Sequence, residues 1–544
     1  MSRSLREKAD ILLSKEKGTV YKDPGGRTTV ALVYPNTYHV GMSNLGFQGI
    51  YGLLNSMNDV LCERAFLPDD ADIHEYVRTG TEIFSMESKK PLTRFDIVAF
   101  SVSFENDYPN ILKILELARI PFRADERTSR HPLVVLGGVC AFLNPEPIAE
   151  FFDICFIGEA DEMLPEFMSM YKSCSGRDEV LTEAQSIEGV YVPRSYNISY
   201  DSIGRIAARR RSENAPEHIK RRYLKDISGS RITTSIITPG TEFSDVYLVE
   251  AMRGCPWNCR FCAVGNIYNP PRKKGLQEIQ QEIQSGREKS KRVGVIGPSL
   301  SDYPHIKDVL QIPGVDFSIT SLRAGKKSAD LIGMIKGHKS VSIAPEAGTE
   351  RLRRVINKRI TEEDILFTAE LMFKEGIETL RLYFMIGLPT ETKQDIEGII
   401  NLVGKIRSVS LRYITLSINT FVPKPFTPFQ WHSMEDPGEV RQRLKLIRKS
   451  LSPLKGVKVY HDVPKYAYMQ GLFARGDRRV SRVIEEMQRE RDWTNAAEKA
   501  GIGKDFYIFR QRTFDEVLPW DFIDTGSSKE KLWEEYQKAL SDAS

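Results

Sequence analysis

Three of the seven cysteines stand close together in the sequence and have the residue type and spacing of metal ligands. Cys255, Cys259 and Cys262 form a C-x3-C-x2-C pattern directly after an apolar segment that is predicted to be a strand. Thiolates are the ligands of iron–sulfur clusters, and a short loop containing glycine and proline can place three of them around one cube. Three ligands leave one iron open to a substrate or cofactor. The spacing therefore predicts a 4Fe–4S cluster with an open iron.

A structural zinc site is the nearest alternative for this loop. Tetrahedral zinc sites use C-x2-C pairs, and the sequence offers neither a second pair nor a nearby histidine. The other cysteines are scattered, and in a reducing compartment they are predicted to be buried small residues rather than disulfides. These are Cys62, Cys140, Cys155 and Cys174.

The cysteine motif resembles that of the radical S-adenosylmethionine (radical SAM) superfamily. In that superfamily the amino and carboxylate groups of S-adenosylmethionine chelate the open iron, and one electron splits the sulfonium to a 5′-deoxyadenosyl radical. The resemblance implies that Phe261 lies beside the adenine. It also implies contacts to S-adenosylmethionine from later loops. The loop at 296–301, with Gly297 and Pro298, would offer backbone carbonyls, and Arg323 would offer a cation to the methionine carboxylate. Glu346 would offer an acidic side chain, and Ile386 with Gly387 would place backbone beside the adenine.

These motifs lie at the ends of alternating strand and helix candidates. The strand candidates are residues 246–250, 293–296, 317–320, 341–343, 379–384 and 414–419. Six such units predict a partial (β/α)6 barrel of the TIM type, with its chemistry at the carboxyl ends of the strands.

An earlier array of the same kind precedes the barrel. Its strand candidates are residues 30–34, 97–102, 133–136 and 154–157, with helical patterns between them. This alternation predicts an α/β fold with a doubly wound, flavodoxin- or Rossmann-like parallel sheet. Ligands of such sheets bind at the carboxyl ends of the strands.

A doubly wound sheet in front of a radical SAM barrel is similar to a cobalamin-binding domain. Domains that bind cobalt through histidine carry Asp-x-His-x-x-Gly after the first strand, and here Tyr38 stands at the histidine position, with Gly41 following. The resemblance implies methylcobalamin bound base-off and His-off, with Tyr38 shielding the lower face of the corrin. The alternative is that the glycines of this domain only end strands. The other implied cofactor contacts are Ser101, Ser103, Gly137, Gly138, Gly158 and Glu159.

The resemblance to cobalamin-domain radical SAM proteins, which are similar to class B methyltransferases, covers nearly the whole chain. It rests on segments 34–46, 421–431, 476–479 and 518–526 as well as on the cysteine loop. It implies methyl transfer from methylcobalamin to an unactivated carbon, and one candidate substrate is a protein side chain such as a glutamine of methyl-coenzyme M reductase. The alternatives are a rearrangement or cyclisation without methyl transfer, methylthiolation, and a non-catalytic cobalamin or redox sensor. No general acid or base can be assigned.

Length and composition agree with a multidomain globular protein. The chain has 544 residues, 41% of them hydrophobic. The predicted parts are an extension at 1–27, the cobalamin-binding domain at 28–175, a connector at 176–240, the radical SAM barrel at 241–434 and a mainly helical C-terminal domain at 435–544.

The net charge and the search for targeting segments limit which kinds of partner are expected. A net charge of +4, from 77 basic and 73 acidic residues, gives no reason to expect nucleic acid as a partner. Neither a signal peptide nor a membrane span is found, so we expect a cytoplasmic protein with no membrane partner. An external one-electron reductant, flavodoxin or ferredoxin, is the expected partner.

Overall fold

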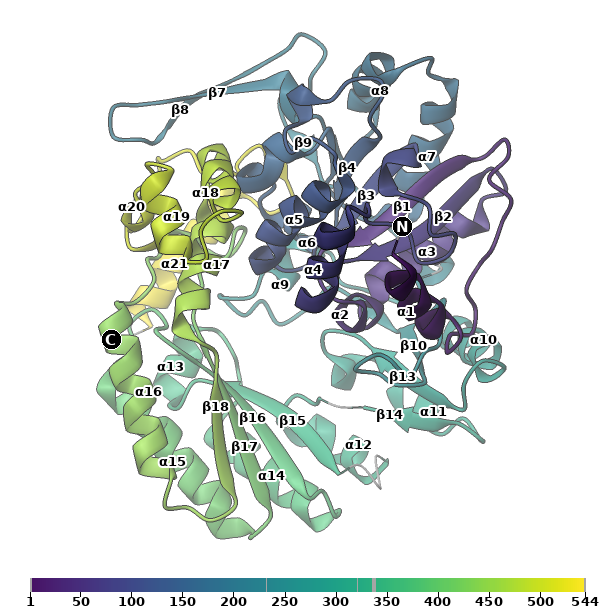
Figure 1. Cartoon of the computed structure of the whole chain (residues 1–544). Coiled ribbons are helices and arrows are strands. Elements are labelled where there is room, and N and C mark those ends of the chain that lie inside the picture. The colour runs from purple at the N-terminus through teal and green to yellow at the C-terminus, as the bar shows by residue number, and fades with distance from the viewer. Residues whose placement is uncertain (1, 231, 320, 335–338, 543–544) are drawn as a thin grey trace.

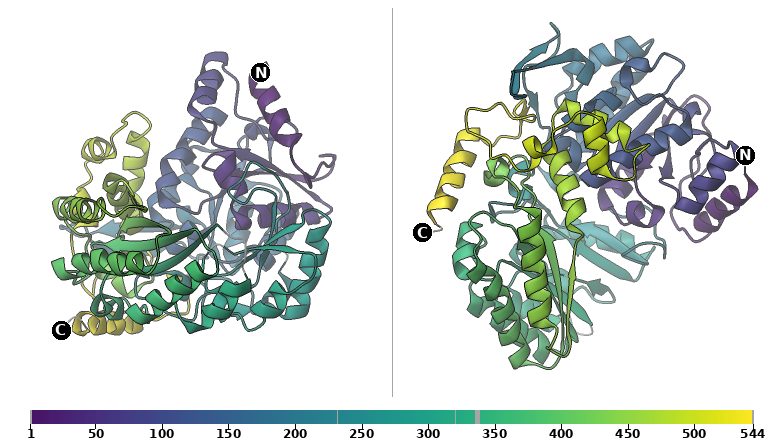
Figure 2. Two further views of the ribbon diagram at one scale, coloured as in Figure 1. Left: turned by 90° about the horizontal axis from the view of Figure 1, so that it is seen from below. Right: turned by 60° about the vertical axis from the view of Figure 1, so that its left-hand side comes forward.

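The computed structural model describes residues 2–230, 232–319, 321–334 and 339–542. Figure 1 shows the N-terminal domain in purple and blue next to the teal and green barrel, with the yellow-green C-terminal helices beside both. The two views of Figure 2 show the same arrangement from other sides. The structure is therefore α/β, with two sheet domains and a helical C-terminal region, as the sequence predicts.

The N-terminal domain is built on one sheet whose strand order is β2-β1-β3-β4-β5-β6. Strands β1 to β5 pair in parallel and β6 pairs antiparallel to β5. The order 2-1-3-4-5 is that of a flavodoxin-like doubly wound sheet, whose switch point lies between β1 and β3. The strands are β1 (Thr28–Tyr34), β2 (Val60–Phe66), β3 (Ile97–Ser101), β4 (Leu133–Gly137), β5 (Ile154–Phe156) and β6 (Val190–Tyr191).

Strand β2 was not predicted, because two charged residues interrupt its apolar pattern. Glu63 and Arg64 are both buried in the middle of the strand. Arg64 forms ion pairs of 2.7 Å with Glu16 and with Glu87, and these pairs compensate for the removal of its charge from water. The partners are distant in sequence, so hydrophobic periodicity could not have found this strand.

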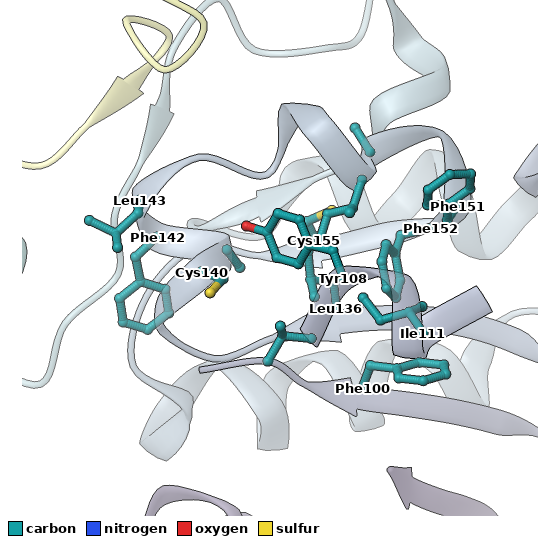
Figure 3. Packing of buried hydrophobic residues seen from close by; sticks show 14 of the residues in the cluster. Phe100, Tyr108, Ile111, Leu136, Cys140, Phe142, Leu143, Phe151, Phe152 and Cys155 are labelled. Atoms are coloured by element: carbon teal, nitrogen blue, oxygen red, sulfur yellow. The ribbon is translucent and has the colours of Figure 1, made fainter. Parts of the chain in front are cut away.

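Helix α5 (Tyr108–Ala118) covers one face of this sheet with a continuous apolar stripe. Figure 3 shows Tyr108 and Ile111 of this helix packed with Phe100 and Leu136 of the strands. Cys140 and Cys155 lie among the same side chains and are fully buried. The prediction that these scattered cysteines are buried small residues is therefore confirmed for both.

The barrel consists of two parallel sheets that meet edge to edge. One contains β10, β13 and β14, the other contains β15 to β18, and a parallel bridge between Ser321 and Ser342 connects them. The helices outside it include α14 (Glu362–Lys374) and α15 (Lys393–Val409), both of which begin at capping boxes. The strands are β10 (Val246–Glu250), β13 (Arg292–Ile296), β14 (Asp316–Ser318), β15 (Ser340–Glu346), β16 (Thr379–Ile386), β17 (Tyr413–Thr420) and β18 (Val457–His461).

The barrel sheet extends beyond the predicted limit at residue 434. Strand β18 pairs with β17, after helix α16 (Pro437–Leu451). Its residues are only half-buried or exposed, so it lacks the apolar run on which the other predictions rested. Residue 320, at the end of the predicted strand 317–320, lies outside the described residues.

The C-terminal region packs against both sheet domains. Helix α17 (Pro464–Arg475) contacts the loop after β3, and the last helix, α21 (Lys529–Ser541), contacts the barrel helix α13 (Glu350–Val355). Within the residues described, none of the helices combines the length and hydropathy needed to cross a membrane.

His432 should make the stability of this region depend on pH. Burial, with the charge of Arg475, lowers the pKa of His432 from 6.5 to about 4. Between about pH 7 and pH 4 the His432 imidazole therefore binds a proton in the unfolded chain but stays neutral in the folded chain. The free energy of unfolding decreases as the pH falls through this range. The loss attributable to His432 is on the order of 3 kcal/mol.

In urea unfolding at pH 7.5 and 5.0, His432→Gln should lose less stability on acidification than the unaltered protein. An equal loss in both would contradict this assignment.

Candidate active site at the cysteine loop

The cysteine loop runs from β11 (Met252–Arg253) to the short helix α9 (Val264–Ile267). Gly254 begins it with a φ of +82°, and a Cβ there would lie 2.3 Å from the carbonyl oxygen of Tyr268. Only glycine fits this close approach without strain. A turn closes the loop, because the Cys262 N–H donates to the Cys259 carbonyl at 3.0 Å. The loop thus turns back on itself so that its cysteines face one region.

The three thiols are half-buried and close enough to influence one another. Burial, the largest cause, together with the neighbouring Cys259 and Cys255, raises the pKa of Cys262 to about 11. Burial raises the pKa of Cys259 too, whereas Lys358 and Arg323 lower it. Such thiols become thiolates when a bound metal or cation stabilises the charge.

The types of the ligand residues at this site, rather than a preformed arrangement around a metal, fit an iron–sulfur cluster. No group of His, Cys, Asp and Glu side chains in the described part of the chain is already arranged around a single metal ion. Three thiols with two cations beside them nevertheless suit an iron–sulfur cube, whose charge with thiolate ligands is negative. These residues would hold it: Cys255, Cys259 and Cys262.

Arg323 and Glu346 both lie beside the cysteine loop and are connected through Lys358. The guanidinium of Arg323 lies 3.7 Å from the ring centre of Trp257 and donates to the carbonyl of Lys358. Lys358 in turn forms a 3.0 Å ion pair with Glu346. Glu346 ends β15 with a φ of +66°, in a region that non-glycine residues seldom adopt. Such strain is characteristic of functional sites.

Asp302 is a member of this site that the sequence analysis did not identify. Its carboxylate accepts hydrogen bonds from Trp257 Nε1 and from Ser299 Oγ, the latter at 2.8 Å. It lies just beyond the predicted loop at 296–301. A signal was present, because Ser-x-x-Asp after a strand is a common loop-fixing pattern.

The remaining predicted contacts to S-adenosylmethionine differ in how accessible they are. Phe261 is half-buried next to Cys262, and Pro298 is exposed. Gly297 packs on Met252, where a Cβ would come within 2.4 Å of Cγ.

Ile386 and Gly387, which are predicted to pack backbone against the adenine, have their backbone groups hydrogen-bonded within the protein. The Ile386 carbonyl accepts from Phe421 N at 2.9 Å, and Gly387 N donates to Glu391 Oε2 at 2.7 Å. The Ile386 side chain is completely buried. The protein itself satisfies these backbone groups, because the strand ladder to β17 continues to this point.

A second candidate site is an apolar cavity of about 80 Å³ in the N-terminal domain. It lies at the carboxyl ends of β3, β4 and β5, beneath α3 (Leu45–Ser56) and α7 (Ala160–Ser173). Of the predicted contacts, Ser101, Gly137, Gly138 and Gly158 line it. A Cβ on Gly137 would lie 4.0 Å from the Phe100 carbonyl oxygen. Gly137 is therefore a glycine at which a side chain would fill the cavity without straining the protein.

The other glycines are required by close contacts within the protein itself. A Cβ at Gly138 would lie 2.4 Å from the Val102 carbonyl oxygen, and one at Gly158 would lie 2.1 Å from that of Arg222. Gly41 packs equally closely on the ring of Phe66. The simpler interpretation, that these glycines serve the packing of strand ends and loops, thus accounts for these three positions.

Tyr38 and Ser103 are held by neighbouring side chains. The Tyr38 hydroxyl donates to Glu16 at 2.7 Å and lies 3.1 Å from Thr238 Oγ1, and its ring packs edge-on to Phe66. Ser103 accepts a hydrogen bond from Asn44 Nδ2 at 3.2 Å. Tyr38 therefore connects the N-terminal extension, β2 and the connector, and its role as a shield of the corrin stays a prediction.

The carboxylate of Glu159, a predicted cofactor contact, is saturated by partners within the protein. It forms ion pairs with Arg253 at 2.6 Å and with Arg272 at 2.7 Å, and it also accepts from Leu224 N at 3.0 Å. All three charged side chains are buried. Glu159 follows the cavity glycine Gly158, and Arg253 lies two residues before Cys255. Glu159 thus joins the cavity to the cysteine loop through an interdomain ion pair, and its contact with a cofactor stays a prediction.

Glu159→Gln should destabilise the junction between the two domains. The substitution leaves the buried guanidinium of Arg272 without a carboxylate partner, which typically costs about 3–5 kcal/mol, whereas Arg253 keeps its ion pairs with Glu250 and Asp161. Glu166→Gln is the matched control, because Glu166 pairs with Arg222 at the surface, where such a pair is worth less than about 1 kcal/mol. Equilibrium unfolding measures both. Equal losses in the two variants would refute the interdomain role.

Two family models match the chain. The model described as "Radical SAM proteins, N-terminal" matches residues 46–193, and the "Radical SAM superfamily" model matches residues 249–403. The second match contains the cysteine loop, Arg323, Glu346 and Gly387.

Several known proteins are similar to the chain over different lengths. The uncharacterised protein MJ0966 of Methanocaldococcus jannaschii is 31% identical over 502 residues, which cover 91% of this chain and 98% of the relative. The tRNA-2-methylthio-N(6)-dimethylallyladenosine synthase of Pelagibacter ubique is 22% identical, over 50% of this chain and 63% of that protein. The structure of the cobalamin-dependent S-adenosylmethionine radical enzyme OxsB with aqua-cobalamin bound has a TM-score of 0.48 at 13% identity, covering 95% of this chain and 80% of that one.

Proposed function

Because the chain belongs to the radical SAM superfamily, which implies S-adenosylmethionine and a 4Fe–4S cluster, we propose that it is a cobalamin-dependent methyltransferase of that superfamily. The proposed reaction moves a methyl group from methylcobalamin to an unactivated carbon of the substrate. A protein side chain is the proposed substrate class, and a glutamine of methyl-coenzyme M reductase is the first to test.

The residues around the cysteine loop have separate tasks in this proposal. The bound cluster supplies the electron that cleaves the sulfonium of S-adenosylmethionine. Arg323 offers a cation to the methionine carboxylate, and Glu346 offers an acceptor to the N–H groups of the amino nitrogen. Trp257, held by Asp302 and covered by Arg323, shields one side from water.

The observation that carries the cobalamin part is the cavity at the strand ends of the N-terminal sheet. It is apolar, and Gly137 leaves space in it for a flat group such as the dimethylbenzimidazole tail. Bound cobalamin would supply the methyl group. The loop at the cavity is connected to the cysteine loop through the ion pair of Glu159 with Arg253, so the two cofactors would lie on either side of one domain junction.

A rearrangement or cyclisation without methyl transfer is the second candidate, supported by the same cavity and the same loop. Methylthiolation expects a second cysteine cluster, and Cys62, Cys140 and Cys155 are instead buried in hydrophobic core.

The products of S-adenosylmethionine separate the two candidate reactions. The reconstituted protein is incubated without oxygen with hydroxocobalamin, a reductant, host extract and S-adenosylmethionine carrying a deuterated methyl group. Methyl transfer predicts both S-adenosylhomocysteine and 5′-deoxyadenosine, with the label in one acceptor. Formation of 5′-deoxyadenosine without S-adenosylhomocysteine or labelled acceptor would favour the second candidate and contradict methyl transfer.

A further inference from the structure

A polar groove of about 370 Å³ lies between the cysteine loop and the C-terminal helix α21. Asn258 and Arg260, the two neighbours of Cys259, form part of its wall. The rest comes from α9, from α13 and the loop after it, and from α21 and the residues just before it, with single residues from other loops. The groove therefore reaches the backbone that carries a proposed cluster ligand.

Arg260 fixes the helix to the loop and pairs with both acidic residues of the groove. It is only 2% exposed and forms ion pairs with Glu535 at 3.0 Å and Asp542 at 2.8 Å. Its guanidinium also donates to the Val355 carbonyl at 2.9 Å. The acidic side chains that line the groove are thus both engaged by one buried arginine.

Four further cations of the groove point to solvent. Arg354, Arg359, Lys531 and Lys538 are all exposed and line it. Within the described residues, no carboxylate lies within ion-pair distance of any of the four. The net charge of the whole chain is only +4, so this is a local excess of positive charge. Such an excess attracts an acidic partner and speeds its encounter.

We propose that this groove is the docking surface for an acidic one-electron carrier protein. The inference rests on the proposed function, because cleavage of S-adenosylmethionine consumes an electron that the chain cannot generate. The carrier would be oxidised by one electron and the cluster reduced by one. Cys259 lies between two residues of the groove wall, so the electron path from the surface to the cluster is short.

Direct binding of a carrier tests the docking surface. The probe is oxidised flavodoxin, titrated into the full-length reconstituted protein while its flavin fluorescence is measured at low and high salt. Lys531→Glu combined with Lys538→Glu should weaken binding at low salt by at least about tenfold. The difference should shrink at high salt, because screening removes the attraction. If the reversed pair does not fold, Lys531→Gln with Lys538→Gln takes its place and should show a smaller loss of the same kind.

The control carries the same change of charge elsewhere. Arg6 and Lys15 are exposed at helix α1 (Arg3–Leu13), on the opposite side of the molecule from α21 (Figures 1 and 2). Arg6→Glu with Lys15→Glu should leave binding unchanged. Unaltered binding by the Lys531/Lys538 double variant, or equal weakening in the control, would overturn the inference.

The rate of 5′-deoxyadenosine formation with dithionite should be the same in all variants. Failure of that reaction in the unaltered protein would count against the proposed function, whereas the binding titration decides the docking surface separately.

Discussion

Cys259→Ala is expected to give a folded protein that loses its full complement of four irons and cleaves S-adenosylmethionine more than about 100-fold more slowly. Even substitutions of residues that only support a metal ligand typically cost 10–100-fold. Removal of a ligand from a three-cysteine site should exceed that range. The measurements are iron and sulfide content after anaerobic reconstitution, and 5′-deoxyadenosine formed with dithionite as reductant.

The control for this substitution is Cys174→Ala. Cys174 is a half-buried cysteine outside the loop, so its loss should change neither iron content nor cleavage. If Cys259→Ala kept four irons and full cleavage, the loop would not be the cluster site. If zinc instead of iron accompanied the purified protein, the structural zinc alternative would replace the cluster.

Gly137→Leu is expected to weaken the binding of hydroxocobalamin by at least about 100-fold. The added side chain would occupy the apolar cavity, because a Cβ at this position would make only an ordinary contact, 4.0 Å from the Phe100 carbonyl oxygen. A group excluded from such a cavity loses the burial of its apolar surface, and about 2.8 kcal/mol suffices for a hundredfold change. The measurement is a spectroscopic titration of the protein with hydroxocobalamin.

Gly138→Ala distinguishes a blocked cavity from a damaged fold. Gly138 has a φ of +95° and touches the Val102 carbonyl, so we expect this variant to lose about 1–3 kcal/mol of stability. Gly137→Leu should unfold at nearly the denaturant concentration of the unaltered protein. Retention of tight cobalamin binding in a folded Gly137→Leu variant would show that the tail, if it binds, lies elsewhere.

Local patterns in the sequence were sufficient to predict much of the fold and the cysteine loop. The strands β1, β3, β4 and β5 are short apolar runs ended by polar or glycine residues, which is a signal that neighbouring residues carry by themselves. The loop around Cys259 is likewise contained in ten residues, 253–262. Arg323 and Glu346 were placed by the order of the motifs along the barrel, and the structure brings both to the loop.

Features that depend on distant partners could not be predicted in this way. Strand β2 is stabilised by the pairing of Arg64 with residues at 16 and 87. The saturation of Glu159 by Arg253 and Arg272 involves residues about a hundred positions away. The hydrogen bond from Phe421 N to the Ile386 carbonyl likewise leaves no trace in the local sequence.

The central claim is that three thiolates leave one iron open to S-adenosylmethionine. The most direct test is electron–nuclear double resonance of the reduced cluster, with S-adenosylmethionine labelled with ¹⁵N in its amino group and ¹⁷O in its carboxylate. The claim predicts hyperfine coupling from both labels, which appears on addition of the labelled compound and is absent from Cys259→Ala. A cluster whose spectrum shows no coupling to either label would contradict it.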